Sequence, residues 1–186
     1  TFMVPNYQYT PAYKNKYWDG KIRLFNIFNR TIYAGLSSHV KKFCEDRNYP
    51  YVLDLHKEEK QPCDDIDTFL SKLSISNGKD PITLHDHQVK AIREALLNRR
   101  CLLLSPTGSG KSLIIYCLLR YYLSCFPEDK KFLVIVPTTG LASQMKSDFL
   151  EYSVNDNSFN EEDIHMIFSG KEKETKRRVV VSTWQS

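Results

Sequence analysis

The chain of 186 residues has a hydrophobic content of 41% and a charged content of 26%, which favour a folded protein with a packed core. This length allows either one domain or a large domain beside a small one. No apolar run approaches the ~20 residues that a membrane-spanning helix needs, and no signal peptide is recognisable. We therefore expect no membrane partner.

Charge is distributed unevenly along the chain. Residues 1–42 carry seven basic residues and one acidic residue, a net charge of +6. Residues 43–80 carry five basic and nine acidic residues, a net charge of −4. The basic N-terminal segment indicates a polyanionic partner.

The cysteines bear on the cellular compartment. They are odd in number and show no C-x-x-C spacing: Cys44, Cys63, Cys101, Cys117 and Cys125. This pattern indicates reduced, mostly structural thiols and predicts a cytoplasmic protein.

Residues 1–80 predict a small α/β domain. After an extended or irregular lead-in at residues 1–17, an alternating apolar and basic pattern predicts a strand that turns at Asn29 and Arg30. The further predicted elements are a strand at 31–33, a helix from 37 or 38 to 48, a strand at 49–55, a helix at 65–73 and a linker at 74–80.

Residues 81–186 predict alternating strands and helices, which is typical of a doubly wound α/β domain with a mostly parallel sheet. The wholly apolar run 132–136 is expected for a parallel strand that is covered on both faces. Further strands are predicted at 101–104, 164–168 and 179–181, and helices at 85–98, 113–126 and from Thr139 to about Tyr152.

The segment Cys101–Ser112 has the pattern of a phosphate-binding loop. A short apolar run leads into a loop with two glycines, and Lys111 and Ser112 then open a long apolar helix. Glycine backbones can turn their amides toward phosphate oxygens, lysine neutralises the β- and γ-phosphates, and the serine hydroxyl is a ligand for Mg²⁺. The strict pattern has a glycine at the position of Ser105. The segment predicts a site for ATP and Mg²⁺ in which Thr107, Gly108, Ser109, Gly110, Lys111 and Ser112 take part.

The motifs around this loop resemble those of the first motor domain of superfamily 2 helicases. The family's adenine-reading segment corresponds to Leu84–Gln88, in which His85 and His87 replace the usual Arg and Tyr. The other similar segments are Pro106–Ser112 for motif I, Val136–Gln144 for motif Ia, Ser169–Gly170 for motif Ib and Val181–Gln185 for motif Ic.

This resemblance implies roles for individual residues. Gln88 would contact adenine, and polar groups at strand ends would hold a nucleic-acid backbone without reading its sequence. The implied DNA contacts are Pro137, Thr138, Thr139, Gly170, Thr183 and Gln185. Each residue taken alone has a simpler explanation, because a threonine after a strand is often a helix cap and a glutamine is often solvated.

A wider resemblance links the chain to the UvsW-type recombination and repair helicases of T4-like phages. It is carried by Trp18–Leu24, Val40–Cys44, Phe69–Leu73 and Asn98–Arg100. It implies a small accessory domain at residues 1–80, followed at 81–186 by part of a RecA-like motor domain. It also implies a monomeric, ATP-driven enzyme that remodels branched DNA or R-loops, with branched, duplex or single-stranded DNA or an RNA–DNA hybrid as partner.

A second basic and aromatic group lies near the N-terminus. Trp18, with Lys16, Lys21 and Arg23, is a candidate for base stacking and phosphate binding. The alternative is a half-buried tryptophan that anchors a hairpin beside a solvated basic face. The charged run Lys171–Arg178 has the same two interpretations, phosphate contact or a solvated loop.

Hydrolysis by this family uses a D-E-x-H box after motif Ic, and no such sequence occurs in the chain. We therefore expect a fragment of a motor that is inactive by itself. Two other functions remain open at this stage: a different P-loop nucleotide hydrolase or kinase, and a DNA-binding module without enzymatic activity.

Overall fold

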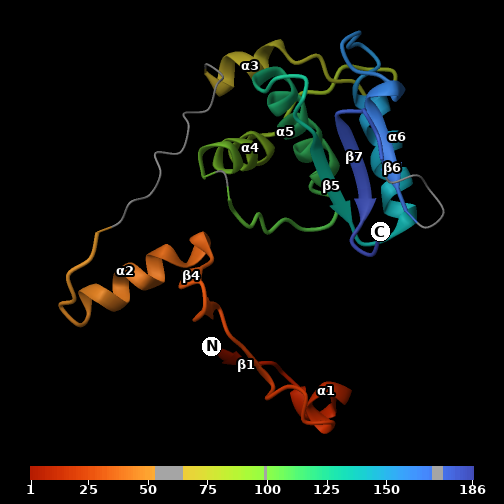
Figure 1. Cartoon of the computed structure of the whole chain (residues 1–186). Helices are drawn as coiled ribbons and strands as arrows, with labels where there is room; N and C mark the ends of the chain where they lie inside the picture. The colour runs from red at the N-terminus through yellow and green to blue at the C-terminus, as the bar shows by residue number, and fades with distance from the viewer. Residues whose placement is uncertain (53–64, 99, 169–173) are drawn as a thin grey trace. The chain divides into compact units, whose positions relative to one another are not determined.

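The computed structural model describes residues 1–52, 65–98, 100–168 and 174–186. The chain forms two compact units, Thr1–Glu58 (unit 1) and Glu59–Ser186 (unit 2) (Figure 1). In the part of the chain that is described, no helix is both long and apolar enough to cross a membrane.

Unit 1 consists of short elements. Two antiparallel pairs, β1 with β2 and β3 with β4, are each two residues long. The elements are β1 (Phe2–Met3), η1 (Tyr7–Tyr9), α1 (Pro11–Lys14), β2 (Lys21–Ile22), β3 (Phe25–Asn26), β4 (Thr31–Ile32), η2 (Ala34–Leu36) and α2 (Ser37–Glu45).

Two predictions for unit 1 differ from the structure. The lead-in at residues 1–17, predicted as extended or irregular, is extended at β1 but also contains the helical elements η1 and α1. Pairing with β2 makes a strand of a segment whose own composition shows no strand period. The strand predicted at 49–55 is absent from its described part, residues 49–52, and residues 53–55 lie outside the described ranges.

Unit 2 contains a three-stranded parallel sheet with the order β5–β7–β6 (Figure 1). Three of the four apolar runs predicted as strands form it, so the predicted α/β fold with a parallel sheet is confirmed. Its elements are α3 (Ile66–Lys72), α4 (Asp86–Asn98), α5 (Lys111–Cys125), β5 (Phe132–Val136), α6 (Thr139–Tyr152), η3 (Glu161–Asp163), β6 (Ile164–Ile167) and β7 (Val179–Thr183).

The core of unit 2 is built from α4, α5, α6 and the inner strand β7. Helix α5 is buried around most of its circumference, as expected for a helix that is apolar on all sides. Phe69 of α3 packs on this core, and Ile75 is 4% exposed within it. Part of the segment before residue 81, which the sequence pattern assigns to the accessory domain, therefore packs in unit 2.

The predicted strand at Cys101–Leu104 is not formed. These residues have no strand assignment, and Leu102 and Leu104 are 84% and 88% exposed. A strand needs a partner for its N–H and C=O groups, and none of β5, β6 and β7 pairs with these residues. Apolar composition alone was therefore insufficient to predict a strand at these residues.

The prediction of reduced cysteines is wrong at one position. Cys44, Cys101 and Cys117 are free thiols, whereas Cys125 at the end of α5 is disulfide-bonded. Burial raises the pKa of the Cys117 thiol to about 12, so this side chain is an inert part of the core.

Candidate functional site

The candidate phosphate-binding loop, residues 105–110, ends at the first turn of α5. Gly108 and Gly110 have φ values of +82° and +77°, a left-handed conformation that side chains disfavour. A Cβ atom on Gly110 would also lie 2.3 Å from Nε2 of Gln88, whereas one on Gly108 would meet nothing within 4 Å. At position 110, glycine is therefore required both because the backbone is left-handed and because a side chain would collide with Gln88. At position 108, only the left-handed backbone requires it.

Ser105 takes the place of the glycine in the strict loop pattern, and the structure gives it a role. Its hydroxyl forms a hydrogen bond with the Ser109 hydroxyl across the loop. The Ser109 hydroxyl also donates to the Pro106 carbonyl at 2.9 Å. These bonds close the loop on itself, which explains how a serine is accommodated here.

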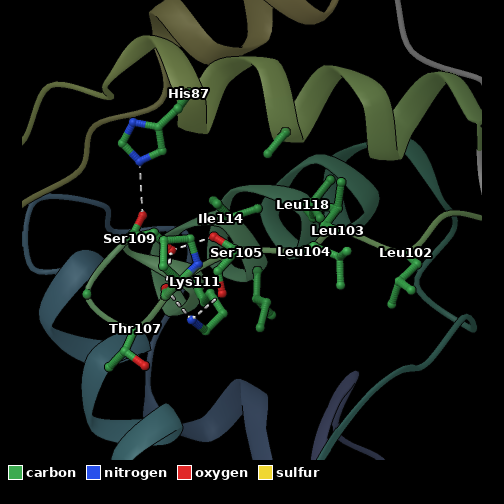
Figure 2. Close-up of a pocket in the computed structure, with 14 residues that line it drawn as sticks. His87, Leu102, Leu103, Leu104, Ser105, Thr107, Ser109, Lys111, Ile114 and Leu118 are labelled. Carbon is green, nitrogen blue, oxygen red and sulfur yellow. Dashed lines mark hydrogen bonds between the residues drawn. The ribbon is translucent and has the colours of Figure 1, made fainter.

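Lys111 directs its charge into the loop. Its Nζ donates to the carbonyl oxygens of Ser105 at 3.0 Å and Pro106 at 2.5 Å (Figure 2). The residue is also the first of α5, where helix amides point away from the helix and favour anions. The ammonium group of Lys111 and the N-terminus of α5 together make the loop suitable for binding phosphate.

Ser112, the predicted Mg²⁺ ligand, lies beside Lys111 in the first turn of α5. Its hydroxyl is 3.0 Å from the hydroxyl of Tyr152 at the end of α6. Burial raises the pKa of Tyr152, so this phenol remains protonated at neutral pH. Tyr152 is a site residue that the sequence analysis missed, because 40 residues separate it from Ser112.

Gln88 is buried behind the loop, and its exposed fraction is 4%. Its Oε1 accepts from the His85 amide at 2.9 Å, and its Nε2 donates to the Ser109 carbonyl at 3.3 Å. Nε2 of His87 lies 3.2 Å from the same carbonyl. Gln88 thus positions the loop, and adenine contact stays a prediction.

A cavity of about 770 Å³ opens beside the loop (Figure 2). One part is polar and formed by the loop and Lys111. The other part is apolar and formed by residues 102–104 together with Ile114, Ile115 and Leu118 of α5. A cavity of this size and mixed character is typical of small-molecule sites.

The predicted DNA contacts of motifs Ia and Ic come together at one edge of the sheet. Val136 and Thr183 are register partners in β5 and β7, so Pro137–Thr139 and Gln185 follow neighbouring strand ends. The Thr138 hydroxyl accepts from the Leu141 amide at 3.3 Å and caps α6. The Thr183 hydroxyl, 5% exposed, lies 2.6 Å from that of Ser186.

The same edge is incompletely described. Gly170, the remaining predicted DNA contact, lies outside the described residues. DNA contact therefore stays a prediction for all of these positions. What the structure shows is that two of the segments lie side by side at the carboxyl ends of parallel strands, where open α/β sheets bind ligands.

The N-terminal basic group has a fixed geometry. Nε1 of Trp18 donates to the Lys21 carbonyl at 2.9 Å. Both guanidinium nitrogens of Arg23 bind the Asp19 carboxylate, at 3.2 and 2.5 Å. The hydrogen bond from Arg23 lowers the pKa of Asp19, so the pair is ionised and balances its own charge. Arg23 is therefore a weaker candidate for phosphate than its sequence context predicts.

The basic run before β7 includes two structural arginines. Arg178 donates to four backbone carbonyls, which belong to Leu123, Phe126, Pro127 and Lys130. Arg177 donates to the Ile164 carbonyl at 2.6 Å. These groups join the end of α5 to the sheet, so neither a phosphate contact nor a solvated loop describes them.

The parallel sheet, the loop closed over Lys111 and the helix that follows define a P-loop nucleotide-binding domain. The family model described as "Type III restriction enzyme, res subunit" matches residues 81–186, and the model "DNA helicase UvsW, N-terminal" matches residues 1–54. The chain belongs to the type III restriction enzyme res-subunit family, a superfamily 2 helicase family, and its N-terminal part is of the UvsW type.

A curated relative supports this assignment. The chain is 40% identical over 192 residues to the ATP-dependent DNA helicase UvsW of Enterobacteria phage T4, and the match covers 100% of the chain. It spans 37% of the length of that relative.

Two solved structures are also similar, and both are of UvsW from bacteriophage T4. The TM-scores are 0.82 and 0.84, at 39% identity and 99% coverage of this chain. The match covers 65% of one solved chain and 37% of the other.

Proposed function

We propose that this chain is the nucleotide-binding part, with an accessory DNA-binding unit, of an ATP-dependent DNA helicase. The observation that carries the proposal is the position of Lys111, whose Nζ lies within the glycine loop at the start of α5. A cation at a helix N-terminus beside backbone amides is suited to a triphosphate.

The residues present are compatible with ATP and Mg²⁺. Gly108 and Gly110 give the loop the conformation in which amides can turn toward phosphate, together with Thr107 and Ser109. Lys111 would neutralise phosphate charge, and the Ser112 hydroxyl is the oxygen that this chain offers to Mg²⁺. When bound, Mg²⁺ would offset the negative charge of the phosphates. Gln88 would keep the loop closed around the ligand.

DNA is the proposed macromolecular partner. The support is the relative from phage T4, the exposed basic segment of unit 1 and the two polar segments at the carboxyl edge of the sheet. Remodelling of branched DNA or R-loops in recombination and repair is the proposed role of the longer protein. A monomer in the host cytoplasm is the proposed form.

The first test compares two lysines of unit 2 in the 186-residue chain. Lys111→Ala should abolish the binding of a fluorescent ATP analogue with Mg²⁺, because it removes the cation in the loop. Lys90→Ala is the matched control, since Lys90 is an exposed lysine of α4 outside the cavity lining. Equal binding by the two variants would contradict the site.

The second test concerns turnover. The chain alone should bind nucleotide without hydrolysing it, because its sequence contains no D-E-x-H box to supply the hydrolytic carboxylates. A protein extended through both motor domains should release phosphate, and DNA should stimulate the release. A P-loop kinase would respond to a small substrate instead of DNA, and a DNA-binding module would show no turnover at all.

A further inference from the structure

Unit 1 contains a hollow of about 670 Å³ whose lining shares no residue with the phosphate loop. Aromatic and basic side chains line most of it, and they include Tyr13, Lys14, Lys16, Tyr17 and Trp18. The volume falls in the range of about 300–1,000 Å³ that is usual for ligand pockets. Tyr17 is 86% exposed, although large aromatic side chains are generally buried when they serve packing alone.

The walls of this pocket are held by short-range packing. Gly20 has a φ of +76°, and a Cβ there would lie 2.3 Å from the ring of Tyr7, so glycine is what allows the ring to pack closely. The ring of Tyr7 in turn meets Tyr13 edge-on, with centroids 4.7 Å apart. The bond from the Trp18 indole to the Lys21 carbonyl fixes the other wall. These contacts hold the rings of Tyr13 and Trp18 in place.

The charges around the pocket favour an anion. Lys14 and Lys16 form no ion pair among the described residues, whereas the one acidic lining group, Asp19, is paired with Arg23. Lys16 has a left-handed φ of 59°, and the amide of the next residue, Tyr17, donates to the Ala12 carbonyl at 2.9 Å. This helix ending places a lysine at a position where glycine is usual.

We propose that this pocket binds an unpaired base of a single nucleic-acid strand. Tyr17 and Trp18 would stack on the base, and Lys14 and Lys16 would contact the adjoining phosphates. Aromatic stacking with lysine contacts is how single strands are bound without sequence preference. Bases in a duplex are covered by their neighbours, so their faces are not accessible to such a pocket. The proposal deepens the proposed function, since it rests on DNA as partner.

The proposal changes which residues of unit 1 are expected to contact DNA. The sequence pattern favours Lys21 and Arg23 beside Trp18, but Arg23 is occupied by Asp19. The pocket instead favours Tyr17, Lys14 and Lys16 as the residues that contact DNA.

The test measures the affinity of the 186-residue chain for a labelled oligo(dT) and for a blunt duplex of equal length by fluorescence anisotropy. Tyr17→Ala should weaken oligo(dT) binding roughly 5- to 150-fold, since stacking on one aromatic contributes about 1–3 kcal/mol per base. Tyr33→Ala is the control, because Tyr33 is 72% exposed in the same unit and does not line the pocket. It should leave affinity unchanged.

Two further measurements separate stacking from charge. Lys16→Asn keeps a residue that tolerates left-handed φ while removing the charge, and it should reduce the salt dependence of oligo(dT) binding. In a Trp184→Phe background, where Trp18 is the remaining tryptophan, oligo(dT) should quench fluorescence. Circular dichroism of each variant establishes that unit 1 remains folded.

The outcomes distinguish this proposal from the proposed function. Equal affinities of Tyr17→Ala and Tyr33→Ala for oligo(dT), while the parent chain still binds DNA, overturn the pocket and leave the helicase proposal in place. Equal losses on oligo(dT) and on the duplex overturn the unpaired base as ligand. Failure of the parent chain to bind any DNA, with nucleotide binding intact, overturns DNA as the partner of this unit.

Discussion

The two units of this chain differ in how they are held together. Every buried hydrophobic side chain among the described residues lies between Ile75 and Val181, in unit 2. In the described part of unit 1 no apolar side chain is fully buried; most are exposed, and Phe28 reaches 100%. Unit 1 depends on turns, side-chain caps and two-residue strand pairs, such as the Asn26 carboxamide that accepts the Phe28 amide at 3.0 Å.

The same kind of substitution should therefore change the free energy of unfolding by different amounts in the two units. A core couples residues far apart in sequence, so one substitution in unit 2 affects many contacts. Local turns act over a few residues, so a substitution in unit 1 should remain local. Matched substitutions in the two units test this, and they are given in order of decreasing expected effect.

The largest contrast is between two phenylalanines. Phe149 of α6 is fully buried and packs against the Tyr116 ring, with centroids 5.8 Å apart. Phe149→Ala should reduce the free energy of unfolding by about 3–5 kcal/mol, because it leaves a cavity in the core. Phe28→Ala should change it by less than about 0.5 kcal/mol. Urea denaturation followed by circular dichroism measures both, and similar losses would contradict the contrast between the units.

Two ion pairs give the next contrast. Arg120 and Asp156 form a bridge in unit 2 with side-chain exposures of 11% and 13%, whereas Arg23 and Asp19 are about half exposed. Asp156→Asn should cost roughly 2–4 kcal/mol, because it leaves the guanidinium buried without its partner. Asp19→Asn should have no measurable effect on unfolding, since solvent screens an exposed pair.

The buried pair also predicts a pH dependence. Burial alone would raise the pKa of Asp156, but hydrogen bonds from Ser158 and the charge of Arg120 outweigh it and hold the pKa below 3.8. A lowered pKa means that this stabilisation is present above about pH 4 and is lost as the pH falls through the folded-state value. Unfolding titrations between pH 6 and 2 should show this loss, and Asp156→Asn should reduce it. An unchanged profile in the variant would exclude Asp156 as its source.

Two glycines test the loop. Gly110→Ala forces a side chain into a left-handed conformation and against Gln88. The strain alone is about 1–2 kcal/mol, so the affinity for a fluorescent ATP analogue with Mg²⁺ should fall roughly 5- to 30-fold. Gly35→Ala in unit 1 meets nothing within 4 Å and should leave nucleotide affinity unaltered. Wild-type affinity in Gly110→Ala would show that the loop does not hold the ligand as proposed.

The smallest effect concerns two tyrosine hydroxyls. Tyr152→Phe removes the hydrogen bond to Ser112, which contributes about 0.5–1.5 kcal/mol to stability. It also frees the Ser112 hydroxyl, so the affinity for nucleotide with Mg²⁺ should rise by up to a few-fold. Tyr51→Phe removes an exposed bond to Glu45, 2.9 Å long, and should change neither quantity. Weaker nucleotide binding by Tyr152→Phe would indicate that this bond supports the site instead of competing with Mg²⁺.

Much of unit 2 follows from sequence patterns because its segments are long and strongly periodic. The strand Phe132–Val136 and the helices around it lie where the patterns predict them. The failures occur where a short apolar segment depends on a distant partner. Residues 101–104 have the composition of a strand but pair with no described strand, and Phe2–Met3 is a strand only because it pairs with Lys21–Ile22.

The sequence by itself determined the local chemistry of this protein. Glycines at 108 and 110, followed directly by Lys111 and Ser112, specify a loop that turns into a helix, because the conformational freedom of glycine and the order of residues along the backbone are local properties. Only the tertiary structure decided which groups meet this loop. Gln88 and Tyr152 reach it from 21 and 40 residues away, since the packing of α4 and α6 against α5 brings them there.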